Sequence, residues 1–229
     1  MIIDNYNFFR NKLEFTNPGD FYVIHIVIRR KDIADEITNN IYNILLKNVD
    51  NFINPYFRLY HCLSNTSKDK KFNDHRVLFT YFISSIEEYD SYEKEIKELC
   101  KLFQARAYLY VVKQNNLKCW NDLKIQTELK DHNVYKYNCF IDRFTLYQQN
   151  KRNIIGLLDL DGDEVQHKDY IIKNILKWRF MYEVQSPHGC HLIYNHHTPD
   201  IFDKVKEFLP HKMSLTPQTI LYYNDEKNS

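Results

Sequence analysis

A chain of 229 residues and 27.9 kDa is long enough for one domain or two small lobes, and its 44% hydrophobic residues can form a real core. The formal net charge of +1 excludes a basic field over the whole surface, so a nucleic-acid partner would need a local patch. The five cysteines are scattered, odd in number and without a Cys-x-x-Cys pair, which argues against a disulfide framework and a zinc ribbon.

Hydrophobic periodicity predicts strands and helices that alternate along the chain. The predicted strands are 21–29, 56–63, 76–84, 105–113, 154–160, 180–185, 190–194 and 219–223. The predicted helices are 34–46, 89–103, 166–177 and 200–209, with one or two more inside 119–149. This order predicts an α+β protein with an N-terminal αβ lobe over 1–115 and a second lobe over 116–229. The second lobe includes the split βαβ pattern of the ferredoxin or RNA-recognition-motif type.

The predicted location follows from what the sequence lacks. No apolar run approaches the ~20 residues of a membrane span, and the first residues show early charge and no apolar core of a signal peptide. We therefore expect a cytoplasmic protein with no membrane contact. The richness in Asn, Lys, Ile and Tyr is typical of A/T-rich genomes, so for a phage or viral protein the location would be the host cytoplasm.

The most informative stretch begins with the sequence IIGLLDLDGDE at Ile154. A short apolar strand ends in Asp159 and Asp161, and because side chains alternate along a strand, both carboxylates point to the same face. Neighbouring carboxylates repel each other, and a divalent cation with oxygen ligands, Mg²⁺ or Mn²⁺, would remove that cost. A solvated Asp-Gly turn is the simpler alternative. A carboxylate within an apolar run is nevertheless expensive unless it is paired or metal-bound.

The stretch ends with the sequence SPHGCHLIY, from Ser186 to Tyr194. Pro187 and Gly189 predict a turn, and His191 starts the apolar run of the next strand. Gly189 would permit a phosphate to approach backbone N–H groups, and an imidazole donor there could bind a triphosphate oxygen. Zinc is disfavoured because adjacent Cys and His residues on a strand point to opposite faces.

Arg106 is the basic residue with the strongest claim to a phosphate partner. It interrupts the apolar strand predicted over 105–113, so it faces either solvent or a groove. The other basic clusters, 29–31 and 211–212, are typical of solvated surface charge.

Two family resemblances bear on function. The sequence LLDLDGD, 157–163, resembles the opening motif of the HAD phosphatases, in which the first Asp is a nucleophile and the second a general acid. This leaves a metal-dependent phosphohydrolase as one alternative, although the motif usually opens that fold and here falls late in the chain.

The order of motifs also resembles the archaeo-eukaryotic primase and primase-polymerase superfamily, over about 76–223. An Asp-x-Asp strand, a helix and a Ser-x-x-Gly-x-His strand lie within an RNA-recognition-motif-like half that follows an αβ lobe. The pieces LFQARAYLYV, LLDLDGD and SPHGCHLIY are also similar to small phage and bacterial proteins related to that superfamily.

The primase resemblance implies a nucleotidyltransferase that uses nucleoside triphosphates on a single-stranded DNA or RNA template, with replication proteins as further partners. Asp159 and Asp161 would be the catalytic residues and the ligands of two Mg²⁺ or Mn²⁺ ions. The expected nucleotide-binding residues are Ser186, His188, Gly189, His191 and Arg106. Family members with polymerase activity carry a third acid on a later strand, and the predicted strand 219–223 has none. A catalytically inactive protein of the same fold, with a nucleic-acid-binding or regulatory role, is therefore the other alternative.

Overall fold

The computed structural model describes residues 1–29, 75–115, 155–195, 199–206, 208–209, 213–214 and 218–224. These residues form a mixed α+β protein with two antiparallel sheets. The chain divides into two compact units, one made of 1–14, 22–111 and 218–229 and the other of 15–21 and 112–217. The predicted helix 34–46, strand 56–63 and helices inside 119–149 lie outside the described residues.

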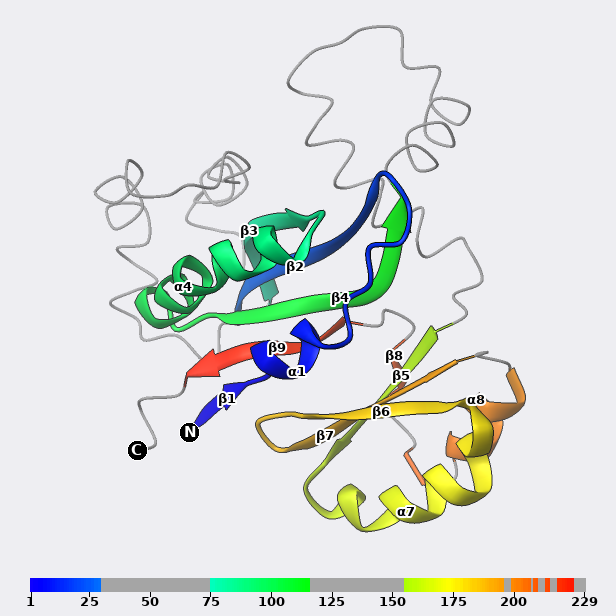
Figure 1. Cartoon of the computed structure of the whole chain (residues 1–229). Coiled ribbons are helices and arrows are strands. Elements are labelled where there is room, and N and C mark those ends of the chain that lie inside the picture. The colour runs from blue at the N-terminus through cyan, green and yellow to red at the C-terminus, as the bar shows by residue number, and fades with distance from the viewer. Residues whose placement is uncertain are drawn as a thin grey trace, which may run out of the picture. The chain divides into compact units, whose positions relative to one another are not determined.

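The first sheet has five strands in the order β1-β9-β4-β2-β3 (Figure 1). These are β1 (Ile2–Asp4), β9 (Gln218–Asn224), β4 (Arg106–Asn115), β2 (Asp20–Arg29) and β3 (His75–Ile83). Helix α4 (Ile86–Leu102) contacts β9 and β3, and the short α1 (Tyr6–Arg10) contacts β9 and α4. Ser85 begins α4 as its N-cap, because its side chain accepts a 3.1 Å hydrogen bond from the Glu88 N–H.

The second sheet has four strands in the order β6-β7-β5-β8. These are β6 (Phe180–Gln185), β7 (Gly189–Asn195), β5 (Ile155–Asp161) and β8 (Met213–Ser214). A helical segment over 162–179 joins β5 to β6, and α8 (Pro199–Lys206) lies between β7 and β8 in the sequence. The elements of this sheet therefore follow the order β-α-β-β-α-β, and each hydrogen-bonded pair of strands is antiparallel.

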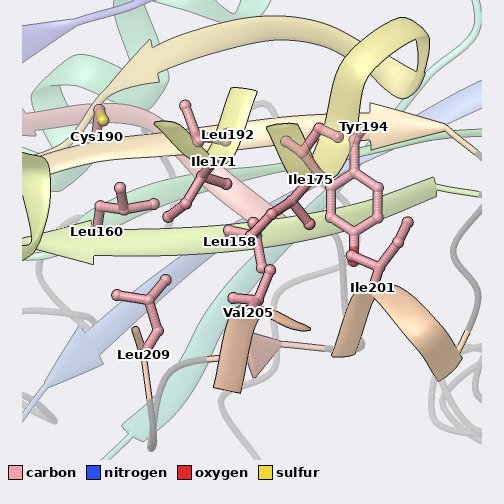
Figure 2. Close-up of a cluster of buried hydrophobic side chains, with 11 residues drawn as sticks. Leu158, Leu160, Ile171, Ile175, Cys190, Leu192, Tyr194, Ile201, Val205 and Leu209 are labelled. Carbon is pink, nitrogen blue, oxygen red and sulfur yellow. The ribbon is translucent and has the colours of Figure 1, made fainter. Parts of the chain in front are cut away.

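One face of the second sheet is buried against its helices (Figure 2). Leu158 and Leu160 of β5 and Leu192 of β7 pack on side chains of the 162–179 segment and of α8. The buried members contributed by those helices are Ile171, Ile175, Leu176, Ile201 and Val205. Burial of these large apolar side chains is the main favourable term for this unit.

The helical segment between β5 and β6 is less regular than the predicted helix 166–177. It consists of a 3₁₀-helix η3 (Gly162–His167), one turn of α-helix α7 (Lys168–Tyr170), a π-helix η4 (Ile171–Leu176) and a 3₁₀ turn η5 (Lys177–Arg179). Hydrophobic spacing detects the apolar side that faces the sheet, but it does not distinguish among these hydrogen-bonding patterns.

Most other described elements match the sequence predictions to within three residues. The predicted strand 180–185 has the bounds of β6. Other predicted elements are present with shifted ends: the strands 21–29, 76–84, 105–113, 154–160, 190–194 and 219–223 and the helices 89–103 and 200–209. Elements β1, α1 and β8 were not predicted, because three, five and two residues are too few for a periodic pattern.

The final strand lies in a different sheet from the one expected. The predicted lobe 116–229 included the strand 219–223, whereas β9 pairs with β1 and β4 in the first sheet. The second sheet is completed instead by β8, which pairs with β5 through Leu157 and Leu158.

None of the helices in the described part of the chain combines the length and apolar character needed to cross a membrane.

Candidate functional site

The two motifs singled out in the sequence lie on neighbouring strands. Strands β5 and β7 pair so that Asp159 is opposite His191 and Asp161 is opposite Gly189. On the other side of β7, Val184 of β6 is opposite His191. Directly opposite residues of an antiparallel pair project to the same face, so both carboxylates and the imidazole share one side of the sheet.

The residues of β5 and β7 that alternate with these polar residues explain why the polar side chains lie on this face. Leu158, Leu160, Cys190 and Leu192 belong to the hydrophobic cluster beneath the helices. Burial raises the pKa of the Cys190 thiol to about 11, which is expected of a structural cysteine and not of a reactive one. Because the period of a strand is two, burying these side chains forces the polar residues to the opposite face.

Asp159 and His191 contact each other directly. The distance from His191 Nε2 to Asp159 Oδ1 is 3.3 Å, and the two side chains are 8% and 39% exposed, respectively. The sequence suggested that a carboxylate in this apolar run needs a partner or a metal, and the structure shows that it has a partner. The carboxylate is also half-exposed, so the desolvation that motivated the expectation is only partial.

Asp161 lies on this face and is also the N-cap residue of the 3₁₀-helix η3. It precedes the 3₁₀-helix η3 in a capping-box arrangement, and its backbone N–H donates to Glu164 Oε2 at 3.0 Å. Gly162 follows with a φ of +55°, a left-handed conformation that favours glycine. Glu164 was not among the sequence candidates, although Asp161-x-x-Glu164 is the signature of a capping box.

The Ser186–Gly189 turn joins β6 to β7 and is tied to the end of β5. The Ser186 N–H donates to the Gly189 carbonyl at 3.1 Å, and the Gly162 N–H donates to the His188 carbonyl at 2.9 Å. A Cβ on Gly189 would lie 1.9 Å from the Leu160 carbonyl oxygen. The close approach of β5 is therefore sufficient reason for glycine at this position, in addition to the ligand contact that the sequence suggested.

Ser186 differs from its surroundings in its hydrogen bonding. The residue is 5% exposed, and its Oγ atom has no hydrogen-bond partner in the structure. Ser186 directly follows β6 and is hydrogen-bonded to Gly189, which is opposite Asp161, so continued alternation places Ser186 on the face of Asp159 and Asp161. A buried hydroxyl without a partner is uncommon and marks a place where a ligand or a water molecule can bind.

The remaining nucleotide-binding candidates lie outside the strands that carry Asp159, Asp161 and His191. His188 is exposed at the tip of the turn, and its carbonyl holds Gly162. Arg106 belongs to the first unit, where it is 3% exposed and its guanidinium lies 4.3 Å from the ring centre of Tyr223. The structure therefore brings together Asp159, Asp161, Gly189 and His191, and it places Arg106 in a different sheet.

The donor atoms on this face suit a hard divalent cation better than zinc. The two carboxylates offer oxygen ligands, which Mg²⁺ and Mn²⁺ prefer, and magnesium commonly uses one or two protein carboxylates together with water and phosphate. Within the described ranges, no three His, Cys, Asp or Glu side chains are grouped so that they could hold a metal by themselves. Two carboxylates alone would leave most of the coordination positions of such an ion to water or other ligands.

Comparisons of this chain with protein-family models, with curated proteins and with solved structures gave no match.

Proposed function

We propose that this protein is a primase-like nucleotidyltransferase that uses Mg²⁺ or Mn²⁺ and nucleoside triphosphates on a single-stranded template. The observation that carries the proposal is the shared face of β5 and β7, on which Asp159, Asp161 and His191 lie beside the Ser186 turn. This supports the grouping that the primase resemblance implies. Two carboxylates, an imidazole and an unpaired hydroxyl provide ligands for cations and donors for phosphate oxygens.

The fold of the second unit adds support. Its element order β-α-β-β-α-β and its strand order β6-β7-β5-β8 are those of a split βαβ sheet of the ferredoxin or RNA-recognition-motif type. In this proposal the first unit, with its five-stranded sheet, is the αβ lobe of a two-lobed primase-like fold.

The proposed roles follow from the positions of the side chains. Asp159 and Asp161 would hold the cations, which would supply the chemistry that activates a 3′-hydroxyl and stabilises the departing pyrophosphate. Ser186 Oγ donates to a triphosphate oxygen. Asp159 orients the imidazole through its 3.3 Å contact with His191 Nε2, which leaves Nδ1 as the ring nitrogen that can donate to a second triphosphate oxygen. The 3′-oxygen forms a bond with the α-phosphorus as the bond to pyrophosphate breaks.

The experiment is calorimetric titration with Mn²⁺ in the presence and absence of a nucleoside triphosphate. We expect metal-dependent triphosphate binding that is lost in Asp159→Ala/Asp161→Ala and retained in Asp163→Ala, which removes an exposed carboxylate two residues further on. Template-directed incorporation of labelled nucleotides is then measured on the same variants. Failure of the folded wild-type protein to bind metal and triphosphate would refute the proposal.

A second candidate is a protein of the same fold that binds nucleic acid or regulates without chemistry. The observation in its favour is that β8, which pairs with β5 on the side away from β7, consists of Met213 and Ser214 and supplies no third carboxylate. Triphosphate binding without incorporation would favour this candidate. Release of inorganic phosphate without a template would instead favour the metal-dependent phosphohydrolase.

A further inference from the structure

The stretch that runs from the π-helix η4 into the first residues of β6 carries a concentration of positive charge. Residues 170–182 include Lys173, Lys177 and Arg179 and no acidic residue, so this stretch has a charge of +3 in a protein whose net charge is +1. Lys173 and Lys177 are exposed. None of the three cations forms an ion pair with a carboxylate in the part of the chain that the structure describes.

A tryptophan lies in the middle of this charge. Trp178 is 70% exposed, the highest value among the exposed large hydrophobic residues described. The Arg179 guanidinium lies over its ring, with Cζ 5.0 Å from the ring centre. Arg179 Nε is buried and has no hydrogen-bond partner. A guanidinium over an exposed indole places a positive charge directly beside an aromatic ring that solvent can reach.

The backbone holds Trp178 at the surface in a strained conformation. Lys177 has a φ of +52° and a ψ of −127°, which is unfavourable for a residue with a side chain. Immediately before it, Ile175 and Leu176 are buried in the hydrophobic cluster, and Phe180 after it packs against that cluster. The turn thus interrupts a buried stretch and exposes the indole between the helical segment and β6.

We infer that Lys173 and Lys177–Arg179 form a binding site for single-stranded nucleic acid, in which Trp178 stacks on an unpaired base and the cations contact phosphates. Exposed aromatic rings next to cations are the usual platform for single strands, because every base offers a flat face and every linkage a negative charge. Bases within a duplex are already stacked, which favours an unpaired strand. The inference rests on the proposed function in that it identifies a template-binding surface.

An anionic membrane is the other ligand with matching charge, and the geometry favours it less. Entry of the indole into lipid would require desolvation of the Arg179 guanidinium that lies against it. A nucleic acid can bind without separating the indole from the guanidinium, because the guanidinium can lie beside a phosphate or a base.

The site is separate from the carboxylates of the proposed function. Trp178 precedes the first residue of β6, whereas Ser186 follows its last residue, so about 20 Å of strand lies between them. Binding at Trp178 needs neither metal nor triphosphate. It can therefore be measured in EDTA, where the chemistry of the proposed function is absent.

The test is fluorescence anisotropy of a labelled oligothymidylate with the full chain in EDTA. We expect Trp178→Ala to weaken binding by about tenfold and Trp178→Phe to retain most of the affinity, since a phenyl ring still stacks. For Lys177→Gln/Arg179→Gln, the slope of log affinity against log salt should become shallower by about 1.4, because two phosphate contacts are lost. Lys94→Gln, which removes an exposed cation from helix α4, is the charge control and should bind like wild type.

The outcomes separate this inference from the proposed function. Asp159→Ala/Asp161→Ala should bind the oligonucleotide like the wild type. If the wild-type protein binds the oligonucleotide but binds no triphosphate with metal, only the nucleotidyltransferase proposal is refuted. Equal affinity of wild type and Trp178→Ala, or no binding by the wild type, overturns the inference. Binding to vesicles of phosphatidylserine and phosphatidylcholine without binding to the oligonucleotide overturns it in favour of a membrane surface. Circular dichroism of each variant checks that the exposed substitutions leave the fold intact.

Discussion

Two polar turns of this protein, Thr16–Asp20 and Ser186–Gly189, meet their hydrogen-bonding needs in opposite ways. In the first, the Asp20 carboxylate is 4% exposed and accepts hydrogen bonds from Thr16, Asn17 and Asn115, together with an ion pair to Lys113 at 3.2 Å. In the second, the Ser186 hydroxyl is buried without a partner, on the side of the sheet that also carries the half-exposed Asp159. The difference teaches that a saturated carboxylate maintains a loop, whereas unmet hydrogen-bonding capacity leaves room for a ligand.

The largest expected difference between the regions of the two turns is the change in the free energy of unfolding when a carboxylate is removed. Asp20→Ala removes the acceptor around which the loop folds and leaves buried donors and Lys113 without their partner, which should lower the free energy of unfolding by about 3 kcal/mol. Asp159→Ala should change it by less than about 1 kcal/mol, because that carboxylate is half-exposed. Urea unfolding of both variants measures this contrast. Equal losses would mean that Asp159 is as structural as Asp20.

Glycine 189 provides a test of the second turn that is independent of its polar groups. A methyl group at this position would meet the Leu160 carbonyl oxygen, so Gly189→Ala should lower the free energy of unfolding by about 2–3 kcal/mol. At Gly162 a Cβ meets no atom within 4 Å, and Gly162→Ala should cost only about 1 kcal/mol for its positive φ. If thermal unfolding ranks the two variants in the reverse order, the close approach of β5 to Gly189 is not a constraint.

Lowering the pH should reduce the stability that the first turn contributes through Asp20. Burial opposes ionisation of Asp20, but hydrogen bonds from Asn115, Asn17 and Lys113 outweigh it and hold the pKa of the carboxyl well below its usual range. The folded pKa is depressed, so the stabilisation is present above the unfolded pKa of about 3.9 and is lost as the pH falls toward the folded pKa.

The measurement is the urea midpoint of wild type and Asp20→Asn between about pH 5 and pH 2. Wild type should lose stability more steeply than Asp20→Asn, which has no carboxyl to protonate at this position. Parallel profiles would show that the Asp20 network does not contribute to acid sensitivity.

The smallest effect is expected at Ser186, and its sign is informative. Because Ser186 Oγ is buried without a partner, Ser186→Ala should leave the free energy of unfolding unchanged or raise it by about 1 kcal/mol. The same substitution should weaken metal-dependent triphosphate binding. Chemical denaturation and calorimetry on one preparation test both expectations. A large loss of stability would instead assign Ser186 a structural partner.

The local pattern of the sequence determined the elements of the second sheet and the pairing of carboxylates on one face. Alternation within LLDLD separates Leu158 and Leu160 from Asp159 and Asp161 whatever the strand packs against, because the period of a strand is two. The turn at Pro187 and Gly189 is equally local, since proline and glycine restrict or permit backbone conformations by themselves.

Tertiary structure alone decided which residues meet. The register that sets Asp159 opposite His191 joins residues 32 positions apart, and β9 joins the first sheet although it follows the second in the chain. The exposure of Trp178 depends on the strained turn at Lys177, which no spacing pattern encodes. Pairings of this kind result from long-range packing and loop closure, and a single sequence specifies them only through the fold as a whole.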